Sequence, residues 1–164
     1  MKKIFAFILA VLISIGAFSA CASTDENIYP FIGPYNDFAR TVGADELDIN
    51  NALVAPENQN LYFFQMGEYT VAFELSGKSI KSGFVFTSSD ACIPDFLCSC
   101  VAMVSFLGEI NIPSYGMILY QFCSLRAGID SIPDKIGKDA FQIIMDENMG
   151  YLLVYMNDDL AVND

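Results

Sequence analysis

Cysteine supplies the most reactive side chains in this sequence, which has five cysteines and no histidine. Beyond the N-terminal segment they are Cys92, Cys98, Cys100 and Cys123. Histidine is the commonest general base and a common zinc ligand, so its absence removes the usual partner of a thiol nucleophile. Cys98 and Cys100 point about 200° apart if they lie on one helix, so they cannot easily share a metal ion. We therefore expect no metal site and no cofactor.

Two interpretations of these cysteines remain open. A disulfide that joins Cys98 or Cys100 to Cys123 is compatible with an oxidising compartment. The alternative, which we favour, is that the cysteines are small buried hydrophobic residues, as free cysteine commonly is.

Acidic side chains gather at Asp45, Glu46 and Asp48, next to Asn50. Carboxylate and amide oxygens are calcium ligands, but this spacing lacks the loop glycine and the distal glutamate of an EF-hand. We expect a solvated turn here. The sequence shows no nucleophile–base pair elsewhere, so we do not expect an enzyme.

The residues that could do chemistry lie mostly in an apolar stretch, Asp90–Gly128, which organises the chain. Pro94 suits the first turn of a helix, and Gly108 is a natural stop. Asn111 and Pro113 then form the start of a second helix, which ends before Gly128. Each arm has about 14 residues, whereas a membrane span needs about 20, so this hairpin is predicted to be core. Its second arm is expected to direct one side inward: Tyr115, Ile118, Leu119, Phe122 and Leu125.

Apolar and aromatic runs separated by turn residues predict five strands, at 60–66, 69–75, 81–87, 140–145 and 151–156, and apolar residues alternate with others in the second of them. Two-residue turns at Gly67-Glu68 and Gly77-Lys78 make the first three antiparallel neighbours. A short helix is expected over 34–42. The fold class is α+β, an antiparallel sheet of about five strands with the apolar helical hairpin on one face. Four strand tyrosines either present binding edges or fill half-buried sheet positions, the interpretation that we favour: Tyr62, Tyr69, Tyr151 and Tyr155.

The N-terminus has the pattern of a secretory signal, with Lys2 and Lys3 followed by the uncharged, mostly apolar segment Ile4–Phe18. Phe18-Ser19-Ala20-Cys21 resembles the lipobox of bacterial lipoproteins, except that leucine is usual in place of Phe18. The resemblance covers residues 1–21 only. It implies that Cys21 is lipidated, becomes the mature N-terminus and anchors the chain to the membrane. The rival is ordinary cleavage before Ser23, which would give a secreted protein.

These patterns divide the chain into a signal peptide at 1–20, a tether at 21–33, a single domain at 34–157 and an acidic tail at 158–164. Removing residues 1–20 takes away two of the eight basic residues and no acidic one, leaving a net charge of −14. Such a surface repels nucleic acid, so we expect no nucleic-acid partner. The sequence thus predicts a lipid-anchored extracytoplasmic lipoprotein with a non-enzymatic binding role toward a protein or peptide. The alternative is an envelope enzyme or thiol-redox protein that uses cysteine or carboxylates.

Overall fold

The computed structural model describes residues 27–108, 113–129, 134–136, 139–146 and 150–157. Several expectations lie outside these residues: the signal peptide, the lipid site at Cys21, the first part of the tether, the cap at Asn111 and the acidic tail. Within the described residues the fold is α+β, as predicted, with an antiparallel sheet and helices packed on it.

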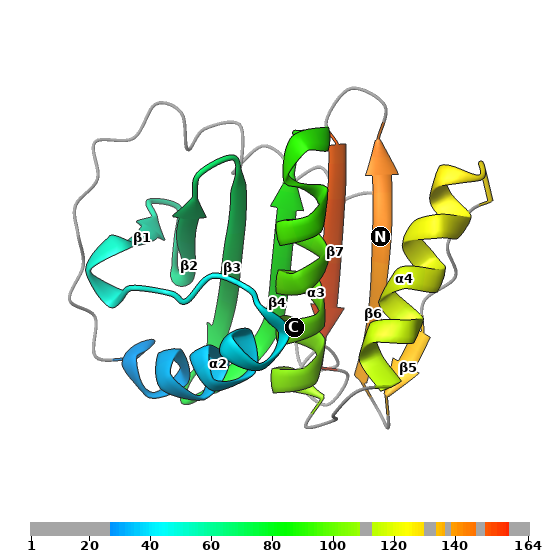
Figure 1. Ribbon diagram of the computed structural model, residues 1–164. Coiled ribbons are helices and arrows are strands. Elements are labelled where there is room, and N and C mark those ends of the chain that lie inside the picture. The colour runs from blue at the N-terminus through cyan, green and yellow to red at the C-terminus, as the bar shows by residue number, and fades with distance from the viewer. Residues whose placement is uncertain (1–26, 109–112, 130–133, 137–138, 147–149, 158–164) are drawn as a thin grey trace.

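The sheet has seven antiparallel strands in the order β1-β2-β3-β4-β7-β6-β5 (Figure 1). The five predicted strands correspond to β2, β3, β4, β6 and β7, and the two turns after Met66 and Ser76 have two residues each, as predicted. The prediction missed the short edge strands β1 and β5, which have four and three residues. The bounds are β1 Ala52–Ala55, β2 Asn58–Met66, β3 Tyr69–Ser76, β4 Ser79–Thr87, β5 Asp134–Ile136, β6 Asp139–Asp146 and β7 Gly150–Met156.

The first described helix, α2, runs over Tyr29–Val42 and therefore begins five residues before the predicted helix. Residues 29–33 are helical, so the prediction that they belong to a tether was wrong. Pro30 lies in the first turn, where proline is tolerated, and Pro34 lies inside the helix. The favourable free energy of burying Ile28, Ile32 and Tyr35 in the core offsets the loss of the backbone hydrogen bond that Pro34 cannot donate.

Both helices of the predicted apolar hairpin form, α3 over Ile93–Leu107 and α4 over Pro113–Arg126, whereas residues 109–112 of the predicted turn lie outside the described residues. The 3₁₀ turns η2 (Ile49–Asn51) and η3 (Asp90–Cys92) precede β1 and α3. By length and composition alone, one helical stretch in the described part of the chain, Asp90–Leu107, would be long enough to cross a membrane. In this fold the stretch contains a core helix, because Phe96 and every residue from Ser99 to Ser105 are buried.

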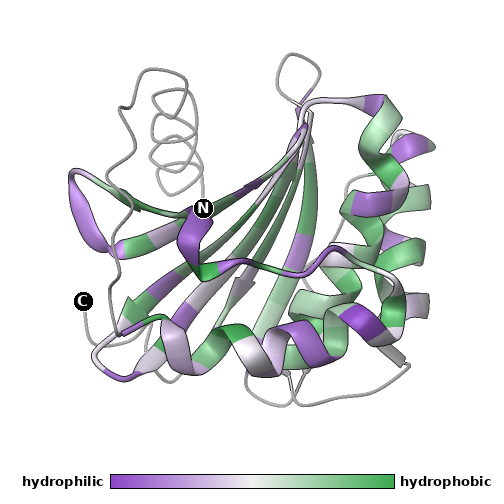
Figure 2. Cartoon of the chain, turned by 60° about the vertical axis from the view of Figure 1, so that its left-hand side comes forward, coloured by the Kyte–Doolittle hydropathy of each residue, from purple (hydrophilic) through white to green (hydrophobic). Residues whose placement is uncertain are grey.

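All three described helices lie on one face of the sheet (Figures 1 and 2). Their apolar sides and the inward side chains of the strands form the main core, which includes Tyr35, Phe73 and Phe96. Val101 and Phe122 are both buried, at 3% and 8% exposure, which confirms that both arms of the hairpin contribute to this core.

The other face of the sheet carries a second apolar cluster. In the 164-residue chain these side chains are buried or partly buried, although no helix that the structure describes lies on this face (Figure 2). We call it the helix-free face: Leu53, Ala55, Leu61, Phe63, Ala72, Phe84, Phe86, Leu152 and Val154.

Candidate functional site: the outer surface of helix α4

Exposed apolar side chains are concentrated on one helix. Tyr115, Leu119 and Tyr120 of α4 are 55%, 39% and 73% exposed, and Cys123 of the same helix is also exposed. Ile129 follows directly after the helix and is exposed as well. We call the first four residues the α4 surface. Figure 1 places α4 at one end of the helix layer, over β6 and β5.

Helical geometry explains why this surface points outward. Ile118, Gln121, Phe122 and Leu125 are buried, and 3.6 residues per turn puts them within an arc of about 100°. Leu119, Cys123 and Tyr120 then lie about 100° to 200° away from Ile118. The prediction that Leu119 faces inward was therefore wrong. Tyr115 lies in the first turn of the helix, only about 60° from Ile118, but it is 55% exposed, so the prediction was also wrong for this residue. The sequence did not reveal the outer side because α4 is apolar on both sides, which leaves no polar stripe to mark it.

Two polar side chains fix the orientation of α4. The Gln121 amide bonds to the backbone of Ile143 in β6 and to Asp134 in β5. At the other end, Arg126 Nη1 donates to the Tyr151 hydroxyl of β7 at 2.9 Å and lies 3.4 Å from Asp90 Oδ1. These contacts hold the inner side of α4 against the sheet, so the α4 surface stays outward.

The charge of α4 differs from that of the chain. The whole sequence has 20 acidic and 8 basic residues, whereas α4 contains no acidic residue and its one charged residue is Arg126. A surface that is apolar and free of acids is therefore presented by a strongly acidic protein.

The four tyrosines considered as binding edges do not contribute to this site. Tyr62, Tyr69, Tyr151 and Tyr155 are 1–6% exposed and belong to the core beneath the helices. Three of their hydroxyls have polar partners at the edge of that core: Tyr69 donates to Asp45, Tyr155 donates to Asp139, and Tyr151 accepts from Arg126. The structure thus contradicts the binding-edge interpretation and supports the sheet-filling one. The exposed tyrosines are instead on helices.

The four cysteines in the described residues are free thiols, so the disulfide considered as the alternative, between Cys98 or Cys100 and Cys123, is not formed. Of these four, Cys100 is buried, Cys92 and Cys98 are partly buried and Cys123 is exposed, so the favoured hydrophobic interpretation holds in full for Cys100 alone. Burial raises the pKa of the Cys100 thiol well above its ordinary value. Burial, and then Asp95, raises the pKa of Cys98. Desolvation raises the pKa of Cys92, and so does Glu68, whose Oε2 lies 3.7 Å from Sγ. These three thiols are therefore poor nucleophiles at neutral pH.

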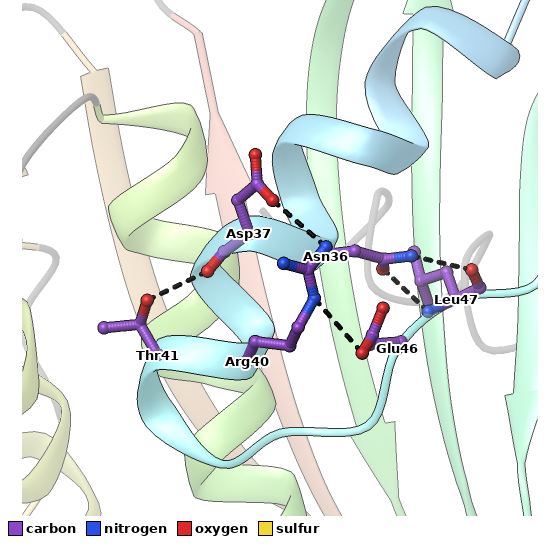
Figure 3. A network of polar contacts seen from close by, with 6 residues as sticks. All are labelled: Asn36, Asp37, Arg40, Thr41, Glu46 and Leu47. Atoms are coloured by element: carbon purple, nitrogen blue, oxygen red, sulfur yellow. Dashed lines mark hydrogen bonds and ion pairs between the residues drawn. The ribbon is translucent and has the colours of Figure 1, made fainter.

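The acidic segment after α2 has structural partners. Asn36 exchanges two hydrogen bonds with the backbone of Leu47, of 2.9 and 2.8 Å, and Arg40 pairs with Asp37 and Glu46 (Figure 3). Asp48 accepts from the backbone N–H of Asn50 and begins η2. In the described part of the chain no group of three or more His, Cys, Asp or Glu residues could hold a metal ion. The arrangement is that of a hydrogen-bonded turn.

Comparisons with protein-family models, with curated proteins and with solved structures found no match for this chain. The α4 surface is therefore interpreted from its own chemistry. It offers aromatic and aliphatic contact area on the outer side of a helix whose inner side is packed on the sheet.

Proposed function

We propose that the mature chain is a membrane-anchored extracytoplasmic lipoprotein that acts as a non-enzymatic binding module. The partner is a protein or peptide with an apolar contact surface, and it docks on the α4 surface. The observation that carries this proposal is the concentration of exposed apolar side chains on one helix of an acidic protein. The signal-like N-terminus with Cys21 supports the anchor.

The composition of the α4 surface favours a protein partner. Tyrosine is enriched in protein interfaces because it gives a large contact area at low entropic cost and keeps a hydroxyl that water can solvate. Tyr115 and Tyr120 provide such side chains on either side of Leu119. An anionic membrane surface is a poorer partner, since the processed chain has 20 acidic residues against six basic ones.

The chemistry of the thiols argues against the alternative of a thiol enzyme. A reactive thiol needs a lowered pKa, typically from a nearby cation or a helix N-terminus. The pKa values of Cys92, Cys98 and Cys100 are raised. Arg126 is three residues after Cys123, but its guanidinium group already contacts Tyr151 and Asp90.

Site-specific photo-crosslinking in intact cells tests the docking surface. A photoreactive phenylalanine analogue at position 120 should give a discrete protein adduct, and Leu119→Asp in the same chain should abolish it. The matched control is the same analogue at Tyr29 of α2, which is 68% exposed and lies outside the α4 surface. Equal adducts at both positions, or an adduct that survives Leu119→Asp, would contradict the proposal.

Mass spectrometry of the mature N-terminus tests the anchor separately. A diacylglyceryl group on Cys21 is expected. An unmodified N-terminus at Ser23 would refute lipidation and leave the docking proposal to be judged by the crosslinks.

A further inference from the structure

The strand register lines up the side chains of the helix-free face in rows across the sheet. The longest row joins Leu53, Phe63, Ala72, Phe84 and Val154, each the direct cross-strand neighbour of the next. This row spans β1, β2, β3, β4 and β7. The next row joins Thr70, Phe86, Leu152 and Ile144. Apolar side chains therefore form a continuous surface over most of the width of the sheet.

Polar residues lie at two ends of this surface. At one end the Thr70 hydroxyl donates to Gln65 Oε1 at 2.9 Å. At the other end Glu74 accepts from the Ser82 hydroxyl at 3.0 Å and lies 3.8 Å from Lys81 Nζ. An apolar centre with a polar rim is the usual anatomy of a protein interface.

The electrostatics of this face suit self-association. The two rows described above contain no charged residue. In the next row, Leu61–Glu74–Ser82, the carboxylate of Glu74 is neutralised by Lys81. Two strongly acidic copies repel each other through most of their surface, so they can approach closely only through faces that are free of net charge.

The shape of the long row is self-complementary. Ala72 lies between Phe63 and Phe84, so the row has a small residue between two large ones. A second copy related by a two-fold axis and displaced by one strand places a phenylalanine ring against Ala72 and receives one in return. Such reciprocal contact defines an isologous interface.

The helix-free face is broad. Its long row crosses five of the seven strands, and the face has Phe63, Phe84 and Phe86 in addition to its leucines and Val154. A stable interface buries roughly 800 Å² on each partner, so contact between two copies has to involve this whole width.

We propose that the processed chain forms a homodimer in which the helix-free faces of two copies pack sheet against sheet. The proposal rests on the processing proposed above, because it concerns the chain after residues 1–20 have been removed. The sheets lie about 10 Å apart, as in other face-to-face packings, and the helices of both copies lie outside. Each α4 surface then stays available for its partner.

Sedimentation of the chain from Thr24 onward, which contains every described element, tests the dimer. The parent should sediment as a dimer at micromolar concentration, and Val154→Lys, at the partly buried border of the face, should be a monomer with an unchanged circular dichroism spectrum. Tyr120→Lys is the matched control on the α4 surface and should remain a dimer. A monomeric parent, which would leave the face to a lipid or another protein, overturns the proposal. So does a dimer that dissociates only with Tyr120→Lys.

Crosslinking gives a second readout if Val154→Lys fails to fold. Ala72→Cys introduces a thiol on the helix-free face and should yield a covalent dimer with a short bismaleimide. The parent carries the exposed Cys123 on α4 and should yield little. Strong crosslinking of the parent, without an increase for Ala72→Cys, contradicts a sheet-to-sheet dimer. Neither result depends on lipidation or on adducts at position 120, so failure of the dimer is distinct from failure of the proposed function.

Discussion

The side chain of Gln121 caps an edge of the sheet by binding the backbone of Ile143. Gln121 Oε1 accepts the Ile143 N–H at 2.7 Å, and its Nε2 donates to Asp134 Oδ2 at 2.8 Å. The neighbouring strand β5 pairs with β6 only from Asp139 to Phe141. Among the described strands, none continues this pairing at Ile143, so a helix side chain supplies the acceptor that a strand would otherwise provide. Open strand edges promote unwanted association, and this contact protects one.

Replacing Gln121 by leucine should therefore destabilise the fold by about 1–3 kcal/mol, because the buried Ile143 N–H loses this acceptor. Urea denaturation monitored by circular dichroism measures the change. Asp134→Asn is the control, since an asparagine can still accept from Gln121 Nε2, and it should cost less. Equal losses for the two variants would show that the contact to Asp134, and not the edge cap, dominates.

Much of the fold could be predicted because local signals and tertiary packing agree. Pro94, Gly108 and Pro113 mark the hairpin helices. Gly67 and Gly77 begin the two-residue turns, and each of these two glycines has a positive φ. The edge strands β1 and β5 were missed because three or four residues are too few to show alternation. Helix α2 starts early because burial outweighs the local effect of Pro34.

The site was harder to predict than the fold. On α4, both sides are apolar, and only packing against β6 decides that Phe122 is inside while Tyr120 is outside. When a helix has no polar stripe, its hydrophobic periodicity does not show which side faces the core. The tyrosines of the strands were misassigned for a related reason, since tyrosine is common both in binding surfaces and in half-buried sheet positions.

Glycine substitutions should have opposite effects at two positions. Gly150 has φ +101°, and a Cβ there would lie 2.2 Å from the Thr87 carbonyl oxygen, a backbone atom that cannot move away easily. Gly150→Ala should lower the free energy of unfolding by at least about 1–3 kcal/mol. Gly116 lies inside α4 with no atom within 4 Å of such a Cβ, so Gly116→Ala should raise it by about 0.5–1 kcal/mol. Thermal melts of both variants check the two signs, and a stabilised Gly150→Ala would refute this account of Gly150.

The stability of the fold should decrease at alkaline pH, in part because of Tyr35. This side chain is fully buried beside Ser99, and neither hydroxyl has a hydrogen-bond partner of good geometry in the described residues. Burial, followed by the nearby Tyr69, raises the pKa of Tyr35 above its ordinary value of 10.0. Above pH 10 the unfolded chain therefore releases a proton that the folded chain keeps, so the contribution of Tyr35 is constant below that pH and is lost as the pH rises.

Tyr35→Phe should consequently flatten the alkaline part of the stability curve. Urea midpoints of parent and variant should be similar near pH 8 and diverge above pH 10, with the variant more stable. Tyr120→Phe, which alters an exposed tyrosine, should follow the parent throughout. Parallel curves for Tyr35→Phe and the parent would mean that Tyr35 ionises as easily in the folded chain as in the unfolded one.

The two sides of α4 can be distinguished with two aromatic residues that lie two positions apart. Phe122 is 8% exposed, and its ring centroid lies 5.0 Å from that of Tyr151, whereas Tyr120 is 73% exposed. Phe122→Ala removes a buried ring and leaves a cavity, which typically costs about 3–5 kcal/mol, a large share of the roughly 5–15 kcal/mol that stabilises a domain. Tyr120→Ala should change the stability by less than about 0.5 kcal/mol, because it alters an exposed side chain.

Both variants in the chain from Thr24 onward can be compared by thermal melting, and the same two proteins can then be assayed for partner binding. We expect Phe122→Ala to melt early, and Tyr120→Ala to melt like the parent while losing the partner; a Tyr120→Ala protein that melts and binds like the parent would remove the α4 surface as the docking site.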